Sequence, residues 1–456
     1  MPDPFPALTL CGVRTATARP GNCRLLQCRL LVGVNRLYMR RLLLLVAALV
    51  LPQPGLAEEP AHPRQRPLTN RVFEPSPARV ERGRYLAEHL LQCFVCHSER
   101  DWNAPGAPPV AGRKGAGMVA SEKGDRRIVA PNITPDAETG AGAWTDDMLA
   151  RAIREGIGHD GRALHPAMWW SSFAGLSDED LAAVVVYLRT LPPVRNALPA
   201  TTLPDDERAR IATGPRPINE PVPGPVPGDS KALGRYLIGV ADCAGCHTAW
   251  ESPRNPGLFA GGNQILRGAR SAFSSNLTQH ESGIAYPKEA FITVMHTGKG
   301  GSLHPIMPWT AFRGLSDTDL GAIYEALGDV YPVAHYVGNV GEPRHCAVCG
   351  QEHAFGEHNR IQLPAGVPVD EAVLERLPGT YRSEELDWTI EVRREAGRLY
   401  ARENGAAAEI ELIALSATRY FGSGLLAPIE FRLPAAGAAT SLVSLEIEPI
   451  ALERAR

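Results

Sequence analysis

The sequence lacks an apolar run long enough to cross a bilayer, which requires ~20 residues. It also lacks an excess of basic charge, because its formal net charge is −3. Hydrophobic residues make up 44% and charged residues 21%, as in soluble globular proteins. Gly and Pro are abundant, with 44 and 40 residues, which favours many turns between short elements. We therefore expect a soluble, multidomain protein with no transmembrane segment in its mature form.

The first residues resemble an export signal. Two arginines precede a short apolar run, and small residues ending at Ala57 provide a cleavage site. Residues 1–57 are thus interpreted as an upstream extension plus signal peptide, with Met39 as the true start. The alternative is that residues 1–38 form a genuine cytoplasmic extension. The predicted location of the mature chain is the periplasm.

Removal of residues 1–57 makes the chain more acidic. That segment contains seven Arg and one Asp, so the remaining chain has a net charge of −9. An acidic chain argues against binding to nucleic acid and favours a cationic or neutral protein partner.

Six of the nine cysteines lie beyond the signal segment, as three C-x-x-C pairs. Two pairs are followed at once by histidine, in Cys93–His97 and Cys243–His247. C-x-x-C-H is the attachment signature of c-type haem, in which the thiols bond the porphyrin and the histidine ligates iron. The alternative, zinc or disulfides at both motifs, is less favoured, because the motif occurs twice in an exported chain, where thiols would otherwise be oxidised. We therefore predict two covalent haem c groups.

A sixth iron ligand is expected from an L-H-P-x-M pattern that follows each haem motif. Its methionines are Met168 and Met307, and thioether ligation suits a low-spin haem of raised potential. The rival ligands are the histidines of the same pattern, His165 and His304. The predicted cofactor-binding residues are Cys93, Cys96, His97, Met168, Cys243, Cys246, His247 and Met307, and the iron ligands among them are His97, Met168, His247 and Met307.

The repeat extends over two units. G-R-Y-L precedes each haem motif, N-[IL]-T follows it, and an L-S-D-x-D-L run ends each unit. Helices are predicted over residues 78–93, from Thr145 to Gly156, from Ser177 to the prolines at 192–193, and over residues 317–327. Gly83 and Gly234 are predicted to allow close crossing of the first and last helices.

Both units resemble class I cytochrome c domains, and the pair is similar to cytochrome subunits of periplasmic alcohol and sugar-acid dehydrogenases. The resemblance covers about residues 75–335. It implies that Asn132 and Asn276 lie in a loop around the haem edge. One departure is Trp169, which stands where these families usually have proline, as at Pro308.

The third C-x-x-C pair, Cys346 and Cys349, is followed by Gly350, so no haem is expected there. Three interpretations remain open. One is a disulfide, which an oxidising compartment favours. Another is a tetrahedral metal site completed by His353 and His358. The third is a pair of free thiols.

The C-terminal part changes character. Alternating polar and apolar residues recur in short runs, which predicts a small antiparallel β domain. The predicted fold class is mainly α: two tandem class I cytochrome c domains followed by a small antiparallel β domain. The predicted ranges are 75–200 for cytochrome domain 1, 215–228 for a Pro-rich linker, 229–335 for cytochrome domain 2, 340–365 for a Cys/His-containing linker and 370–456 for the β accessory domain.

The predicted function is periplasmic electron transfer through two His/Met-ligated haems. The partner would be a redox protein: a dehydrogenase or quinol-linked donor, an oxidase, or a soluble carrier. The alternative is a dihaem enzyme, a peroxidase or a sulfur-compound dehydrogenase, with one open haem site. A methionine in both repeats favours the carrier, because six-coordinate iron has no vacant position for substrate.

Overall fold

The computed structural model describes residues 65–455 except 105, 268–270, 301–302, 385, 407 and 447–448. The expected extension and signal peptide over residues 1–57 lie outside the described residues. Within the described part, none of the helices combines the length and the hydropathy needed to span a membrane.

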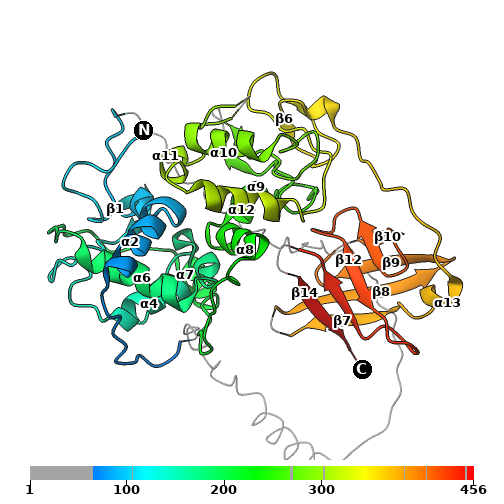
Figure 1. Cartoon of the computed structure of the whole chain (residues 1–456), viewed down its shortest axis with the longest axis horizontal. Helices are drawn as coiled ribbons and strands as arrows, with labels where there is room; N and C mark the ends of the chain where they lie inside the picture. The colour runs from blue at the N-terminus through cyan, green and yellow to red at the C-terminus, as the bar shows by residue number, and fades with distance from the viewer. Residues whose placement is uncertain are drawn as a thin grey trace, which may run out of the picture. The chain divides into compact units, whose positions relative to one another are not determined.

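The first domain, which contains the first C-x-x-C-H motif, consists of short helices separated by long loops (Figure 1). Its elements are α2 (Pro77–Tyr85), η1 (Leu86–Leu90), α3 (Cys93–Cys96), β1 (Met118–Lys123), β2 (Arg126–Ala130), α4 (Asp146–Glu155), η2 (Pro166–Met168), α5 (Trp170–Phe173), α6 (Asp178–Thr190) and α7 (Asp205–Ala212). The haem motif lies on α3, and the predicted methionine ligand is the last residue of η2.

The predicted helix boundaries around α4 and α6 are confirmed. Thr145 caps α4 by accepting a hydrogen bond from Met148 N, and Gly156 ends it in the left-handed region. Ser177 caps α6 in the same way, through Asp180 N. The helix expected over residues 78–93 is shorter, because α2 passes into the π-helical turn η1 and Gln92 adopts φ 54°.

The second domain repeats this plan. Its elements are α8 (Ser230–Val240), α9 (Cys243–His247), β3 (Gln264–Leu266), β4 (Ala272–Phe273), α10 (Lys288–Thr297), α11 (Trp309–Phe312) and α12 (Asp317–Leu327). The predicted close helix crossing is confirmed in both domains. A Cβ atom on Gly83 would lie 1.9 Å from Ala183 O, and one on Gly234 would lie 2.0 Å from Ala322 O.

The first and second domains contact each other through reciprocal hydrogen bonds. Tyr85 of the first domain donates to Asp319 Oδ2 at 2.6 Å, at the start of α12. Tyr236 of the second domain donates to Asp180 Oδ2 at 2.6 Å, at the start of α6. The tyrosine of each G-R-Y-L motif thus binds the capped helix start of the other repeat.

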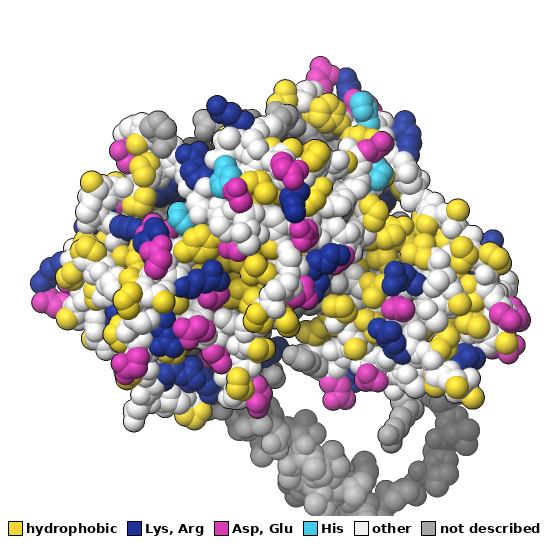
Figure 2. Space-filling model, viewed as in Figure 1, with side chains coloured by type: hydrophobic (Ala, Val, Ile, Leu, Met, Phe, Trp, Pro, Cys, Tyr) yellow, Lys and Arg dark blue, Asp and Glu magenta, His cyan; other side chains and the backbone are white. Residues whose placement is uncertain are grey.

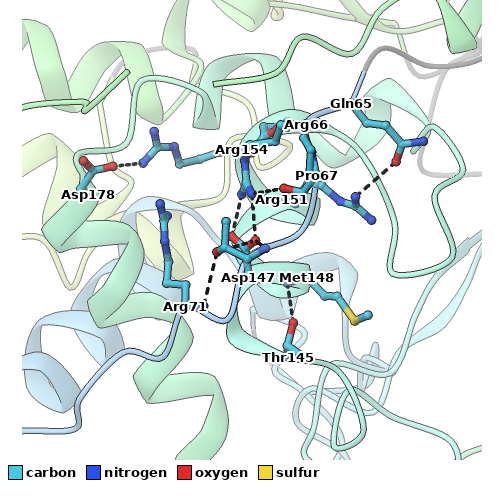
Figure 3. A network of polar contacts seen from close by, with 12 residues as sticks. Gln65, Arg66, Pro67, Arg71, Thr145, Asp147, Met148, Arg151, Arg154 and Asp178 are labelled. Atoms are coloured by element: carbon cyan, nitrogen blue, oxygen red, sulfur yellow. Dashed lines mark hydrogen bonds and ion pairs between the residues drawn. The ribbon is translucent and has the colours of Figure 1, made fainter. Parts of the chain in front are cut away.

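A buried ion-pair network fixes the segment before α2 to helix α4 (Figure 3). Arg66 Nη2 lies 2.7 Å from Asp147 Oδ1, and Arg66 Nε lies 2.8 Å from Glu155 Oε1. Thr69 N also donates to Asp147 Oδ2, at 2.7 Å. Residues 66–69 are therefore held against the first domain.

Between the second domain and the C-terminal domain, a short hairpin is formed by β5 (Arg344–His345) and β6 (Glu352–His353), followed by η4 (Gly356–His358). Helix α13 (Glu371–Leu374) then leads into the C-terminal strands.

The C-terminal domain is a closed barrel. Its strands are β7 (Gly379–Ser383), β8 (Trp388–Glu395), β9 (Arg398–Glu403), β10 (Ile410–Ala414), β11 (Arg419–Gly422), β12 (Ile429–Arg432), β13 (Ser441–Ser444) and β14 (Ile450–Arg454). Each strand pairs antiparallel with its sequence neighbour, and β14 closes the ring on β7, so the described strands leave no unpaired edge. Tyr381, Tyr420 and Phe431 fill the interior. Figure 1 shows these strands in orange and red.

The expectation of a mainly α protein is wrong. Helices make up 27% and strands 18% of the residues that the structure describes. Two physical causes account for the difference. The first two domains consist mostly of loops and short hairpins, and the alternating C-terminal segments form a complete closed barrel.

Candidate functional site

The first haem motif occupies one helical turn, α3, whose start is set by the left-handed conformation of Gln92. Cys93 and Cys96, the first and last residues of this turn, are partly buried, and the next residue, His97, donates from its backbone N to Cys93 O at 2.9 Å. His97 is 4% exposed, and its Nδ1 lies 2.8 Å from Pro131 O. With Nδ1 donating to this carbonyl, Nε2 is the ring nitrogen available to ligate iron.

The second motif reproduces this geometry. Asp242 adopts φ 53° before α9, in the position that Gln92 has in the first domain. His247 is 8% exposed, and its Nδ1 lies 2.8 Å from Ser275 O. Burial lowers the pKa of His247, as it does that of His97, and the bond to the carbonyl opposes this only in part. Both imidazoles are therefore held neutral, which is the form that ligates metals.

The N-[IL]-T motif holds the carbonyl that orients each histidine. Asn132 follows Pro131 directly, and its Oδ1 accepts from Thr134 N at 3.0 Å and from Thr134 Oγ1 at 2.7 Å. Asn276 makes the same two bonds to Thr278, both at 2.8 Å. The motif is thus a buried turn that fixes the histidine acceptor.

The two methionines occupy loops that pack against the same core. Met168 ends the 3-10 turn η2, and Met307 precedes α11; both side chains are partly buried against the hydrophobic core. A tryptophan supports each loop, since Trp170 Nε1 donates to Leu164 O and Trp309 Nε1 donates to His304 O, both at 3.2 Å. The repeated placement fits a pair of distal ligands.

The departure at Trp169 changes the local backbone. Trp169 adopts φ 54°, in the left-handed region, whereas Pro308 has φ −76°. Proline cannot adopt a positive φ, so the two methionine loops have different shapes. The first loop ends in a 3-10 turn closed by a 2.8 Å bond from Trp169 N to Pro166 O.

The rival histidine ligand of the first domain is engaged elsewhere. His165 Nδ1 accepts from Ala167 N at 3.0 Å, and its Nε2 lies 3.3 Å from Glu207 Oε1 and 3.2 Å from Arg126 Nη2. Both ring nitrogens therefore have partners, which favours Met168 over His165 as the distal ligand.

The cysteines of both motifs fit covalent haem. None of Cys93, Cys96, Cys243 and Cys246 is paired in a disulfide. Burial raises the pKa of Cys93 and of Cys243 to about 12, because their surroundings disfavour a charged thiolate. Two free thiols beside an oriented imidazole form the donor set that a c-type haem requires.

These motifs and this fold define a c-type cytochrome. The cytochrome c family matches residues 80–192. Three curated relatives are similar to parts of the chain. A nicotinate dehydrogenase subunit of Pseudomonas putida is 30% identical over 59% of this chain and 22% of its own length. The cytochrome c subunit of a quinone alcohol dehydrogenase from Gluconobacter oxydans is 32% identical over 64% of this chain and 67% of its own. A diheme cytochrome c-type protein of Cereibacter sphaeroides is 30% identical over 36% of this chain and 54% of its own length.

The chain therefore belongs to the cytochrome c family, as a protein similar to the cytochrome subunits of dehydrogenases. Electron transfer through covalent haem c is the activity of this family. The chain spans only about a fifth of the nicotinate dehydrogenase subunit and about half of the diheme cytochrome.

Sequence reasoning missed several residues of these sites. Pro131 and Ser275 act through backbone carbonyls, which carry no side-chain signal. Tyr85 and Tyr236 bridge the two domains, and the one sequence signal for this contact is their recurrence in both G-R-Y-L motifs.

Proposed function

We propose that this chain binds two covalent haems, one in each cytochrome domain, and transfers electrons between a dehydrogenase partner and an acceptor outside the cytoplasm. The observation that supports this best is the duplicated histidine geometry. His97 and His247 are both buried and both held at 2.8 Å by a backbone carbonyl beside an Asn-x-Thr turn.

Within each domain, the cysteines, the histidine and the methionine have different roles in binding the haem. The four cysteines anchor the groups, His97 and His247 supply the proximal nitrogens, and Met168 and Met307 supply the distal sulfurs. Bound haem iron would gain and lose one electron. The protein contributes orientation, exclusion of water and soft distal ligands that raise the reduction potential.

The partner is proposed to be a dehydrogenase because two relatives, which match 59% and 64% of this chain, are named as dehydrogenase subunits. Figure 2 shows acidic and basic side chains interspersed over the visible face, without a large patch of one sign. Docking on this face would therefore combine local charge pairs with apolar contact. The acidic balance of the chain, −9 without residues 1–57, favours a neutral or basic acceptor.

The test is haem stoichiometry followed by ligand replacement in protein exported from a host that attaches haem c. Intact mass should show two haems per chain. Met168→Ala and Met307→Ala should each open one iron, lower its potential and create carbon monoxide binding at one haem.

Two controls separate ligation from general damage. Met148→Ala, on helix α4, removes a methionine of the same domain that is not a proposed ligand, and it should leave both haems six-coordinate. His165→Ala should do the same if Met168 is the ligand. A single haem, or a high-spin haem that turns over peroxide in the unmutated protein, would contradict the carrier and favour the dihaem enzyme.

A further inference from the structure

Four potential metal ligands converge outside the haem motifs. His335 lies after helix α12, Cys346 and Cys349 lie in the turn between β5 and β6, and His353 lies on β6. Their ligand atoms all lie within 4.8 Å of one another. The two cysteines and His335 are 0% exposed and His353 is 1% exposed, so this cluster is fully shielded from water.

The two histidines are oriented as metal ligands usually are. His335 Nδ1 lies 2.9 Å from Ala260 O, and His353 Nδ1 lies 3.0 Å from Ala354 O. These carbonyls occupy one ring nitrogen of each imidazole and leave Nε2 for the cluster. His353 Nε2 lies 3.4 Å from Cys349 Sγ.

His335 Nε2 has no hydrogen-bond partner among the described residues, although it is buried. A buried polar atom without a partner costs about 1–3 kcal/mol and calls for an explanation.

Hydrogen bonds within the turn of residues 346–350 fix the positions of its two sulfur atoms. Cys349 N donates to Cys346 Sγ at 3.4 Å, and Gly350 N donates to Cys346 O at 2.8 Å. Gly350 has φ 77°, so glycine suits the residue that closes this turn. The residue that excludes a haem from the third C-x-x-C pair thus shapes the turn around its sulfurs.

We propose that His335, Cys346, Cys349 and His353 bind one zinc ion. Two thiolates and two neutral imidazoles form the tetrahedral Cys2His2 set that zinc prefers, and the two negative charges balance the ion in this dry site. Four protein ligands leave no open position, so the zinc is structural.

A Cys346–Cys349 disulfide would account for only half of the cluster. It would leave the Nε2 atom of His335 buried without a partner. The prediction of His358 as a ligand is wrong. Its side chain is 57% exposed and lies outside the cluster, whose fourth member is His335.

The zinc site would stabilise the loop beside the second haem motif. Ala260, which orients His335, is followed by Gly261, whose N donates to His247 O at 2.8 Å. Gln351, in the cysteine hairpin, donates from Nε2 to Gly262 O at 2.8 Å. The zinc would therefore hold residues 260–262 in place, and through them the backbone of His247, whose role as a haem ligand rests on the proposed function.

The test is elemental analysis of haem-loaded protein purified without a polyhistidine tag. We expect iron and zinc in a ratio of about 2:1, which is about one zinc per chain. The double variant Cys346→Ser/Cys349→Ser should lose at least nine-tenths of its zinc while it still carries covalent haem. His358→Ala and His345→Ala, two exposed histidines of the same segment, are matched controls and should retain zinc.

A wild-type protein without zinc, in which alkylation and mass analysis find a Cys346–Cys349 disulfide, would overturn the proposal. Zinc retained in the double variant would also overturn it. If that variant does not fold, the wild-type zinc and thiol counts decide alone. Haem is counted separately, from its absorbance, so a protein with one zinc and fewer than two haems would refute the proposed function and leave the zinc site intact.

Discussion

The two reciprocal tyrosine hydrogen bonds between the cytochrome domains are expected to contribute unequally to stability. Tyr85→Phe and Tyr236→Phe each remove one hydroxyl that donates to a carboxylate and accepts from a backbone N–H of a serine cap. Because the sites repeat each other, similar effects would be the simplest expectation. The surroundings of the two carboxylates differ, however.

Asp180 keeps a strong partner when Tyr236 loses its hydroxyl. Arg82 binds Asp180 through two bonds of 2.8 Å, so the carboxylate stays paired. Asp319, which is 9% exposed, has no ion pair and no other side-chain hydrogen bond among the described residues. Burial, followed by the bond to Asp319, raises the pKa of Tyr85 to about 12, so this hydroxyl remains a donor at neutral pH.

The magnitudes follow from this difference. Tyr85→Phe removes a hydrogen bond to a charged group and leaves a buried carboxylate short of a partner, which should cost about 2–3 kcal/mol. Tyr236→Phe should cost about 1 kcal/mol, because Arg82 compensates for the lost donor. The melting temperature of haem-loaded protein, followed by circular dichroism, should therefore fall further for Tyr85→Phe. Equal losses, or a larger loss for Tyr236→Phe, would refute the reasoning.

Two further predictions concern packing and acid stability. Gly234→Ala should destabilise the second domain by about 3 kcal/mol in denaturant unfolding, because its Cβ would lie 2.0 Å from Ala322 O. The control is Gly239→Ala on the same helix, where a Cβ would have no atom within 4 Å; this variant should be neutral or stabilising in the same assay. Burial disfavours the ionised form of Asp147, but the bonds from Arg66 and Thr69 outweigh this and lower its pKa to about 2. The stability from this carboxylate should be present above ~pH 4 and lost as pH falls towards 2. Melting curves of Asp147→Asn should therefore show a weaker pH dependence over that range than wild type, and an unchanged slope would contradict this assignment.

The sequence by itself determined the local chemistry of this protein. The C-x-x-C-H spacing identifies haem attachment because both thiols and the imidazole must lie within one helical turn, which adjacent residues specify. Ser177 and Gly156 likewise mark helix ends, since capping depends on residues only a few positions apart. The tight crossing at Gly83 could be inferred because only a missing side chain permits it.

Only the tertiary structure decided what depends on contacts distant in sequence. Backbone carbonyls at Pro131 and Ser275 orient the histidines. Every residue has a backbone carbonyl, so the residue type does not predict which one accepts the bond. The closure of the C-terminal strands into a barrel depends on pairing β14 with β7, across nearly the whole domain. The fourth member of the Cys/His cluster is His335, 11 residues before Cys346, and not His358, which is closer to the cysteine pair along the chain. Spacing along the chain reports which ligands are possible, but burial and direction in three dimensions select among them.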